Sequence, residues 1–241
     1  TSKTLDMNLA LSGSGGNISL APGASTGSGR VIQIGGTTPG ARTLDLGSVV
    51  RTIDVADGAQ AVDALITSQI TGTGGINKTG AGVLQLTAAN TFSGDTKVSA
   101  GTLTLGNNTQ PLQNSALDTS GAGVVNITGL NALTLGGLKG STNLTSVITT
   151  GYVGSLYSLN LNPGTGVTNT YSGVISDGAE LSLTKTGLGT QVLSGTNTYS
   201  GTTTISNGAL QIGSAGVGKT GTGAVTAQTG GAVEEFCINT A

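Results

Sequence analysis

The chain contains no histidine, no tryptophan and one cysteine, and aromatic side chains occupy only 2% of its 241 positions. Without histidine, general-base catalysis loses its commonest group, and neither a serine nor Cys237 has an imidazole partner to activate it. A single cysteine cannot form an internal disulfide, so packing and backbone hydrogen bonds must hold the fold together. The scarcity of aromatic rings disfavours the stacking surfaces that carbohydrate enzymes and lectins use.

Charge is also sparse, at 8% of residues with a formal net charge of −2. The nine basic residues are scattered, which excludes a nucleic-acid partner because phosphate binding needs clustered Lys and Arg. Weak repulsion between molecules favours self-association. No run approaches the ~20 apolar residues of a transmembrane helix. The chain begins at Thr1 without a signal-peptide pattern, so we expect a mature product or an excised segment.

What the chain has in quantity is glycine, at 43 residues, together with short apolar stretches of period two. From Leu5 to Leu11, leucine and methionine alternate with small or polar residues, and triplets such as Ile53-Asp54-Val55 repeat that rhythm. Such alternation is typical of short strands with one buried face. The interval 56–76 is compatible with helical turns or a strand, and we favour a strand. The composition therefore predicts an all-β protein with many tight turns.

A long internal repeat organises the sequence. Residues 185–213, KTGLGTQVLSGTNTYSGTTTISNGALQIG, align without a gap to residues 78–106, KTGAGVLQLTAANTFSGDTKVSAGTLTLG. A truncated copy of the central motif, NTYSG, occupies residues 169–173. Repeated units with identical turn sequences favour a solenoid, in which like residues stack about 4.8 Å apart.

The pattern K-T-G-x-G followed by N-T-(F/Y)-S-G and G-x-L-x-x-G resembles the autotransporter-associated β-strand repeat, also called the passenger-associated transport repeat. The resemblance implies a right-handed parallel β-helix, exposed on the surface of a Gram-negative bacterium after secretion. We therefore expect a single parallel β-helix over residues 1–241, with repeat units at 76–106 and 183–213.

Within the motif, Asn90 and Asn197 are expected to hydrogen-bond turn backbone or to adopt the left-handed conformation. Phe92 and Tyr199 are expected to fill corners of the coil. Five glycines suit corners that require positive φ. These are Gly80, Gly82, Gly94, Gly101 and Gly106.

The two copies differ at one apolar triplet. Leu84-Gln85-Leu86 aligns with Gln191-Val192-Leu193, which moves the apolar residue by one position. We interpret this shift as a β-bulge in the second copy.

Two candidate sites are weighed against structural explanations. GSAGVGKT at residues 213–220 matches the phosphate-binding loop, but the following residues form a poor helix, and a turn and strand are expected there instead. Asp45, Asp54, Asp57 and Asp63 form the one local carboxylate cluster, and a glycosidase-like pair is conceivable there. The simpler interpretation places them on solvent faces or at a turn. We predict no catalytic, cofactor-binding or metal-binding residues and no cofactor.

These observations predict an extracellular structural or adhesive β-helix, acting as a stalk, adhesin or filament subunit at the bacterial cell surface. The expected partners are further copies of the chain, joined head to tail, and a host or neighbouring cell surface. The alternatives are a polysaccharide-active β-helix enzyme, which needs converging carboxylates, and a glycan-binding module with a polar ladder.

Overall fold

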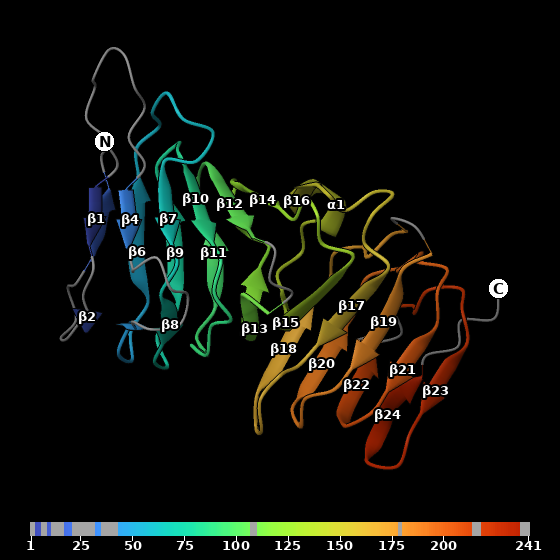
Figure 1. Cartoon of the computed structure of the whole chain (residues 1–241). Helices are drawn as coiled ribbons and strands as arrows, with labels where there is room; N and C mark the ends of the chain where they lie inside the picture. The colour runs from blue at the N-terminus through green and yellow to red at the C-terminus, as the bar shows by residue number, and fades with distance from the viewer. Residues whose placement is uncertain are drawn as a thin grey trace.

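The structure is a computed structural model that describes residues 3–5, 9–10, 17–20, 32–34, 43–106, 110–177, 180–213 and 218–236. Over these ranges the chain is a parallel β-solenoid, with strands β1 and β24 at opposite ends (Figure 1). One turn of helix, α1 (Leu144–Val147), is the helical exception. In the same ranges no helix is long and apolar enough to cross a membrane. The predicted all-β parallel solenoid is confirmed.

One face of the solenoid is a ten-stranded sheet that runs its whole length. Its strands are β3 (Ile18–Leu20), β6 (Arg51–Val55), β9 (Ile76–Thr79), β11 (Thr96–Val98), β13 (Leu112–Asp118), β15 (Ala132–Lys139), β17 (Ser158–Leu161), β19 (Ser182–Lys185), β21 (Thr203–Ile205) and β23 (Val225–Ala227).

The remaining faces are made by three shorter sheets. A seven-stranded sheet contains β1 (Lys3–Leu5), β4 (Ile32–Ile34), β7 (Ala64–Ile66), β10 (Val83–Leu86), β12 (Thr102–Leu105), β14 (Val124–Asn126) and β16 (Ile148–Thr150). A three-stranded sheet contains β2 (Leu9–Ala10), β5 (Thr43–Asp45) and β8 (Gln69–Thr71). A four-stranded sheet contains β18 (Thr168–Tyr171), β20 (Thr190–Leu193), β22 (Gly208–Ile212) and β24 (Gly231–Phe236). Within the interval 56–76, residues 64–66 and 69–71 form strands β7 and β8, which confirms the strand interpretation there, whereas residues 56–63 form a loop.

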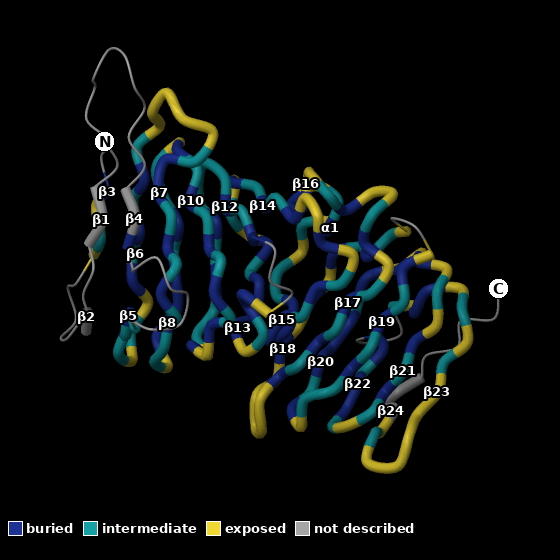
Figure 2. Tube along the Cα trace, in the orientation of Figure 1, coloured by how far each residue is buried: buried dark blue, intermediate teal, exposed yellow. Residues whose placement is uncertain are grey.

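The in-register pairing of strands in successive coils explains why strands of only three or four residues are enough to build the core. Leu133, Leu159 and Leu183 pair in successive coils, and all three are buried. Each inward side chain therefore packs between its counterparts in the coils before and after it. Figure 2 shows buried positions recurring from coil to coil over the described residues. Phe92 and Tyr199 are buried in this core, as the motif predicted.

The glycines of the motif serve two different purposes. Gly80 and Gly101 adopt φ of +73° and +67°, as predicted. The prediction of positive φ is wrong for Gly82, Gly94 and Gly106. A Cβ on Gly94 would lie 2.4 Å from the carbonyl carbon of Gly74 in the adjacent coil, so close approach of backbones explains this glycine.

The solenoid changes direction at β15, and strands β18 to β24 tilt relative to β7 to β12 (Figure 1). Only the first half of β15, Ala132 to Leu135, pairs with β17. Beyond Leu135 the strand faces side chains of the four-stranded sheet instead: Asn169 Nδ2 donates to the Gly136 carbonyl at 3.1 Å, and Gln191 bonds to Leu138. The first half of β15 therefore pairs with β17, and its second half contacts the four-stranded sheet.

The predicted β-bulge at Gln191 in the second repeat copy is wrong. Strand β20 pairs with β18 and β22 without a register shift, and Gln191 itself points inward and is buried. Its Oε1 accepts from Leu138 N, and its Nε2 donates to Leu138 O, both at 2.9 Å. The glutamine takes the inward place that Leu84 occupies in the first copy because it must satisfy the backbone that β17 leaves unpaired.

Candidate functional site

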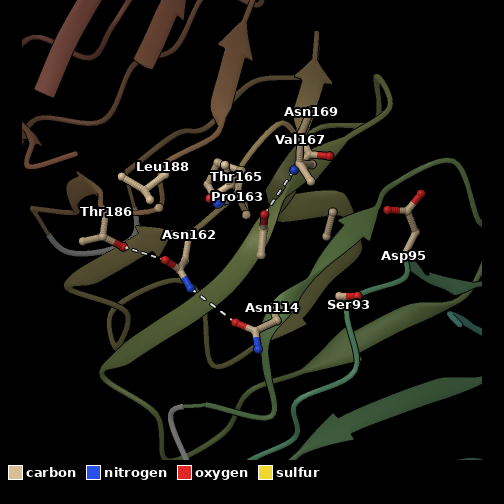
Figure 3. A pocket seen from close by; sticks show the side chains of 14 residues that line it. Ser93, Asp95, Asn114, Asn162, Pro163, Thr165, Val167, Asn169, Thr186 and Leu188 are labelled. Atoms are coloured by element: carbon tan, nitrogen blue, oxygen red, sulfur yellow. Dashed lines mark hydrogen bonds between the residues drawn. The ribbon is translucent and has the colours of Figure 1, made fainter. Parts of the chain in front are cut away.

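The bend creates an open groove of about 470 Å³ (Figure 3). Its floor includes Ala116 and Gly136 of β13 and β15, and the loop between β17 and β18 forms one wall. Asp95 contributes a carboxylate to the lining and pairs with Lys139 Nζ at 2.5 Å. The groove thus lies where the chain leaves one sheet and begins another.

A row of hydrogen-bonded polar side chains crosses the groove. Asn162 Nδ2 donates to the Gln113 carbonyl at 3.1 Å and lies 3.4 Å from Asn114 Oδ1. Thr186 Oγ1 lies 2.9 Å from Asn160 Oδ1 and 3.3 Å from Asn162 Oδ1. Figure 3 shows Asn114, Asn162 and Thr186 in this row. The contacts to Gln113 and Thr186 orient the amide of Asn162.

One wall of the groove is apolar. Val167 and Leu188 both line the groove, with exposed fractions of 43% and 66%, and the buried Pro163 lies beside them. The Thr190 amide donates to the Val167 carbonyl at 2.8 Å, which joins the two segments that carry these side chains. The groove therefore combines amides and hydroxyls with an exposed aliphatic surface.

Two of the candidate carboxylates lie in strands of different sheets, and the other two lie in the loop between β6 and β7. Asp45 lies in β5 and accepts from the Gly47 amide, whereas Asp54 lies in β6 and accepts from Thr79 Oγ1. Asp63 precedes β7, and Asp57 is exposed in a loop. In the part of the chain that the structure describes, no three His, Cys, Asp or Glu side chains are placed to hold a metal ion.

Asp63 lies on no solvent face, in contrast to one of the two positions, solvent face or turn, that were predicted for the four aspartates. The side chain is fully buried, with Oδ1 accepting from Gly58 N at 2.9 Å and Oδ2 from Val83 N at 2.8 Å. It therefore closes the 58–63 loop and ties it to the next coil.

The phosphate-loop match is only partly described, because residues 214–217 lie outside the described ranges. Lys219 forms a parallel bridge with Thr196, and its carbonyl accepts from Asn197 Nδ2 at 2.7 Å. The segment continues into strand β23 rather than into a helix, as predicted. A helix N-terminus, which phosphate loops use to hold their ligand, does not follow this motif.

The motif asparagines each connect three coils. Asn90 Oδ1 accepts from Ile70 N at 2.8 Å, and its Nδ2 donates to the Pro111 carbonyl at 2.9 Å. Asn197 repeats the arrangement with Ile175 N on one side and Lys219 O on the other. Ile70 and Pro111 precede and follow Asn90 by about one coil each. The predicted bond to turn backbone is confirmed at Pro111, whereas Ile70 lies in strand β8. The left-handed alternative is not adopted by either asparagine, and the reach across coils is an additional finding.

The motif lysines are buried inside the solenoid. Lys78 Nζ donates to the carbonyls of Thr79, Gly80 and Ala100 at 2.8 to 3.1 Å. Lys185 Nζ donates to Gly187 and Asn207 carbonyls. Burial lowers the pKa of both ammonium groups to about 8, although Asp54 and Asp63 partly oppose this for Lys78.

The sequence profile of the passenger-associated-transport-repeat family matches residues 76–109 and 183–212. These ranges coincide with the two segments in which buried lysine, bridging asparagine and paired glycines recur. The chain carries passenger-associated transport repeats. The predicted resemblance to autotransporter passengers is thereby confirmed.

A 93-residue stretch, 39% of the chain, is 33% identical to the adhesin BmaC autotransporter of Brucella suis biovar 1 (strain 1330). The matched stretch spans only 3% of that relative's length. No solved structure matches the chain. Together the repeat matches and this relative support a surface β-helix of the autotransporter type.

The passenger-associated transport repeats contain one feature that sequence reasoning missed. Lys78 has the same parity as Ile76 in β9, and Lys185 has the same parity as Leu183 in β19, so period-two alternation places both lysines inside. The signal was present in the spacing, but a lysine is rarely assigned to a core. The groove had no sequence signal, because its walls come from separate coils.

Proposed function

We propose that this chain is a rod-like segment of a secreted bacterial surface protein and serves as an adhesive stalk. The observation that carries the proposal is the placement of two passenger-associated transport repeats within one continuous solenoid. The similarity to a named adhesin supports the adhesive part. A rod whose backbone hydrogen bonds run along its axis can hold a binding surface away from the cell envelope.

Adhesion can be tested with beads coated with the purified 241-residue chain. We expect such beads to bind epithelial cells or bacterial cells well above albumin-coated beads, and heat-denatured chain to lose the effect. Equal binding by native chain and albumin would contradict the adhesive role. Immunolabelling of intact bacteria that express the parent protein, compared with permeabilised ones, tests the proposed extracellular location.

We propose that the chain has no enzymatic activity. Asp45, Asp54 and Asp63 each accept hydrogen bonds from backbone amides or from a neighbouring threonine. Asp45 and Asp54 lie in different sheets, and Asp63 is buried at the end of a loop. A retaining or inverting glycosidase needs two carboxyl groups within about 5–10 Å across one groove. Release of reducing ends from bacterial or host polysaccharides, lost in an Asp54→Asn variant, would contradict this.

A second proposal is head-to-tail self-association. Over the described residues, β1, β2 and β3 end their sheets at one pole, and β23 and β24 end theirs at the other. Strands at the end of a sheet present unpaired amides and carbonyls, and two unlike ends can join without closing into a ring.

The test of this association is light scattering and electron microscopy of the purified chain at increasing concentration. Leu9 pairs in register with Leu44, a fully buried core residue, so Leu9→Lys places a charge at the first pole. We expect filaments from the unmodified chain and shorter particles from the variant. A chain that remains monomeric at every concentration would contradict the proposal.

A further inference from the structure

We propose that the groove at the bend binds one or two pyranose rings of a neutral glycan. The inference rests on the proposed adhesive function and gives that function a ligand class and a location. Its volume, about 470 Å³, is within the range of small-molecule sites, roughly 300–1,000 Å³.

The polar row supplies the hydrogen bonds that sugar hydroxyls need. Asn114 is exposed in the groove, and Asn162 is held by contacts to the Gln113 carbonyl and to Thr186. Because side-chain amides both donate and accept, they can meet a hydroxyl in either role. Because Asn162 is already held in place, less entropy is lost when a ligand binds to it.

The aliphatic wall supplies the contact for the carbon-bound face of the ring. Val167 and Leu188 are two of the five large apolar side chains that are exposed over the described residues. Both lie on the same groove, beside Pro163. Aromatic rings are scarce in this chain, so burial of a sugar's C–H face against aliphatic groups takes the place of aromatic stacking.

Charge and backbone pairing decide between ligand classes. No lysine or arginine is among the described residues that line the groove, and its one carboxylate, Asp95, is already paired with Lys139. This disfavours phosphate and acidic sugars. An extended peptide would need free strand edges, but Asn169 and Gln191 already bond to the half of β15 that β17 leaves unpaired.

The experiment uses the purified chain with lactose, maltose and N,N′-diacetylchitobiose as neutral probes and N-acetylneuraminic acid as the acidic one. Saturation-transfer NMR detects weak binding of these sugars, and calorimetry measures the dissociation constant. Two groove variants, Asn114→Ala and Leu188→Asp, alter exposed side chains and should leave the fold intact. Asn131→Ala and Val153→Asp are the matched controls, because both residues are exposed and neither lines the groove.

We expect at least one neutral sugar to bind, with the dissociation constant raised about tenfold or more by each groove variant and less than about twofold by each control. The proposed site would be overturned by any of three results. These are no binding of the three neutral sugars, binding of the acidic sugar alone, and equal effects of the groove and control variants.

The two proposals fail separately. Sugar binding with no bead adhesion retains the groove and removes the adhesive role. Bead adhesion that survives Asn114→Ala and Leu188→Asp, with no sugar bound, retains the adhesive role on another surface and removes the groove.

Discussion

Buried polar side chains in this solenoid act as connectors between coils, and they are few enough to consider individually. Asn90, Lys78 and Gln191 each satisfy main-chain groups that the sheets leave unpaired. A buried backbone group without a partner costs about 1–3 kcal/mol, so these side chains matter more than their number suggests. Their removal should be measurable one residue at a time.

Asn90→Ala should lower the free energy of unfolding by about 2–4 kcal/mol, because it leaves the Ile70 amide and the Pro111 carbonyl without partners. Urea denaturation followed by circular dichroism measures the change. Asn131→Ala, at an exposed site, is the control and should stay within about 0.5 kcal/mol. A similar loss in both variants would contradict a bridging role.

Ser68 is the exception among the buried polar groups of the described residues, since its hydroxyl has no hydrogen-bond partner. Ser68→Ala removes an unsatisfied group at little cost in packing, so we expect stability to be unchanged or to rise by about 1 kcal/mol. The same urea titration checks it. A clear loss of stability would mean that the hydroxyl has a partner after all.

At the scale of secondary-structure elements, the strands were predictable from the sequence, but the pairing between distant strands was not. Alternation in Ile76-Asn77-Lys78 and Leu183-Thr184-Lys185 is sufficient to predict strands and their inward faces. The division of β15 between two partners was not predictable, because Gln191 contacts Leu138, 53 residues earlier, and no local pattern records that contact. For the same reason Gln191 suggested a bulge, whereas it takes the inward place.

Gln191→Leu tests this junction by giving the second repeat the residue that the first repeat has in Leu84. We expect a loss of about 2–4 kcal/mol despite the gain in hydrophobicity, since both the amide and the carbonyl of Leu138 lose their partner. Gln85→Leu, on an outward position of β10, is the matched control. If Gln191→Leu is as stable as the unmodified chain, the β15 edge is satisfied in some other way.

The two buried lysines make stability depend on pH. Their pKa is lowered to about 8 in the folded chain, against 10.5 ordinarily, so between these values the unfolded chain binds more protons. Stability should therefore rise as pH increases from about 8 toward 10.5, by at most ~1.4 kcal/mol per pH unit for each lysine. Burial raises the pKa of Tyr152 and Tyr171, which reverses the trend above about pH 10.

Urea midpoints measured between about pH 7 and pH 9.5 isolate the lysine contribution. Lys78→Met and Lys185→Met should each flatten the rise, and Lys97→Met, at a half-buried outward position of β11, should leave it unchanged. A midpoint that does not change with pH in the unmodified chain would contradict the burial of both ammonium groups.

At the scale of the whole molecule, stability is distributed along an axis. Each interior coil has two neighbours, whereas the described C-terminal strands β23 and β24 have one each. In such a chain each coil contributes its own stability and that of its interfaces. Loss of protection should therefore begin at the ends.

Hydrogen–deuterium exchange should be slowest in β9 to β15 and fastest in residues 218–236, with a gradient between them. Mass spectrometry of peptic fragments measures this directly. Uniform protection along the chain would indicate one cooperative unit instead. Addition of a neutral disaccharide that binds the groove should slow exchange in β13 and β15 more than in β6.

The bridging asparagines also bear on the order in which the rod forms. Asn90 accepts from a residue 20 positions earlier and donates to one 21 positions later, and Asn197 does the same over 22 positions in each direction. If the chain folds from either end, each asparagine first makes one of its two hydrogen bonds, to the coil that has already folded. The other group of its amide has no partner until the next coil folds against it. Folding can then proceed sequentially, one coil at a time. Each asparagine needs only the two adjacent coils and no distant segment of the chain.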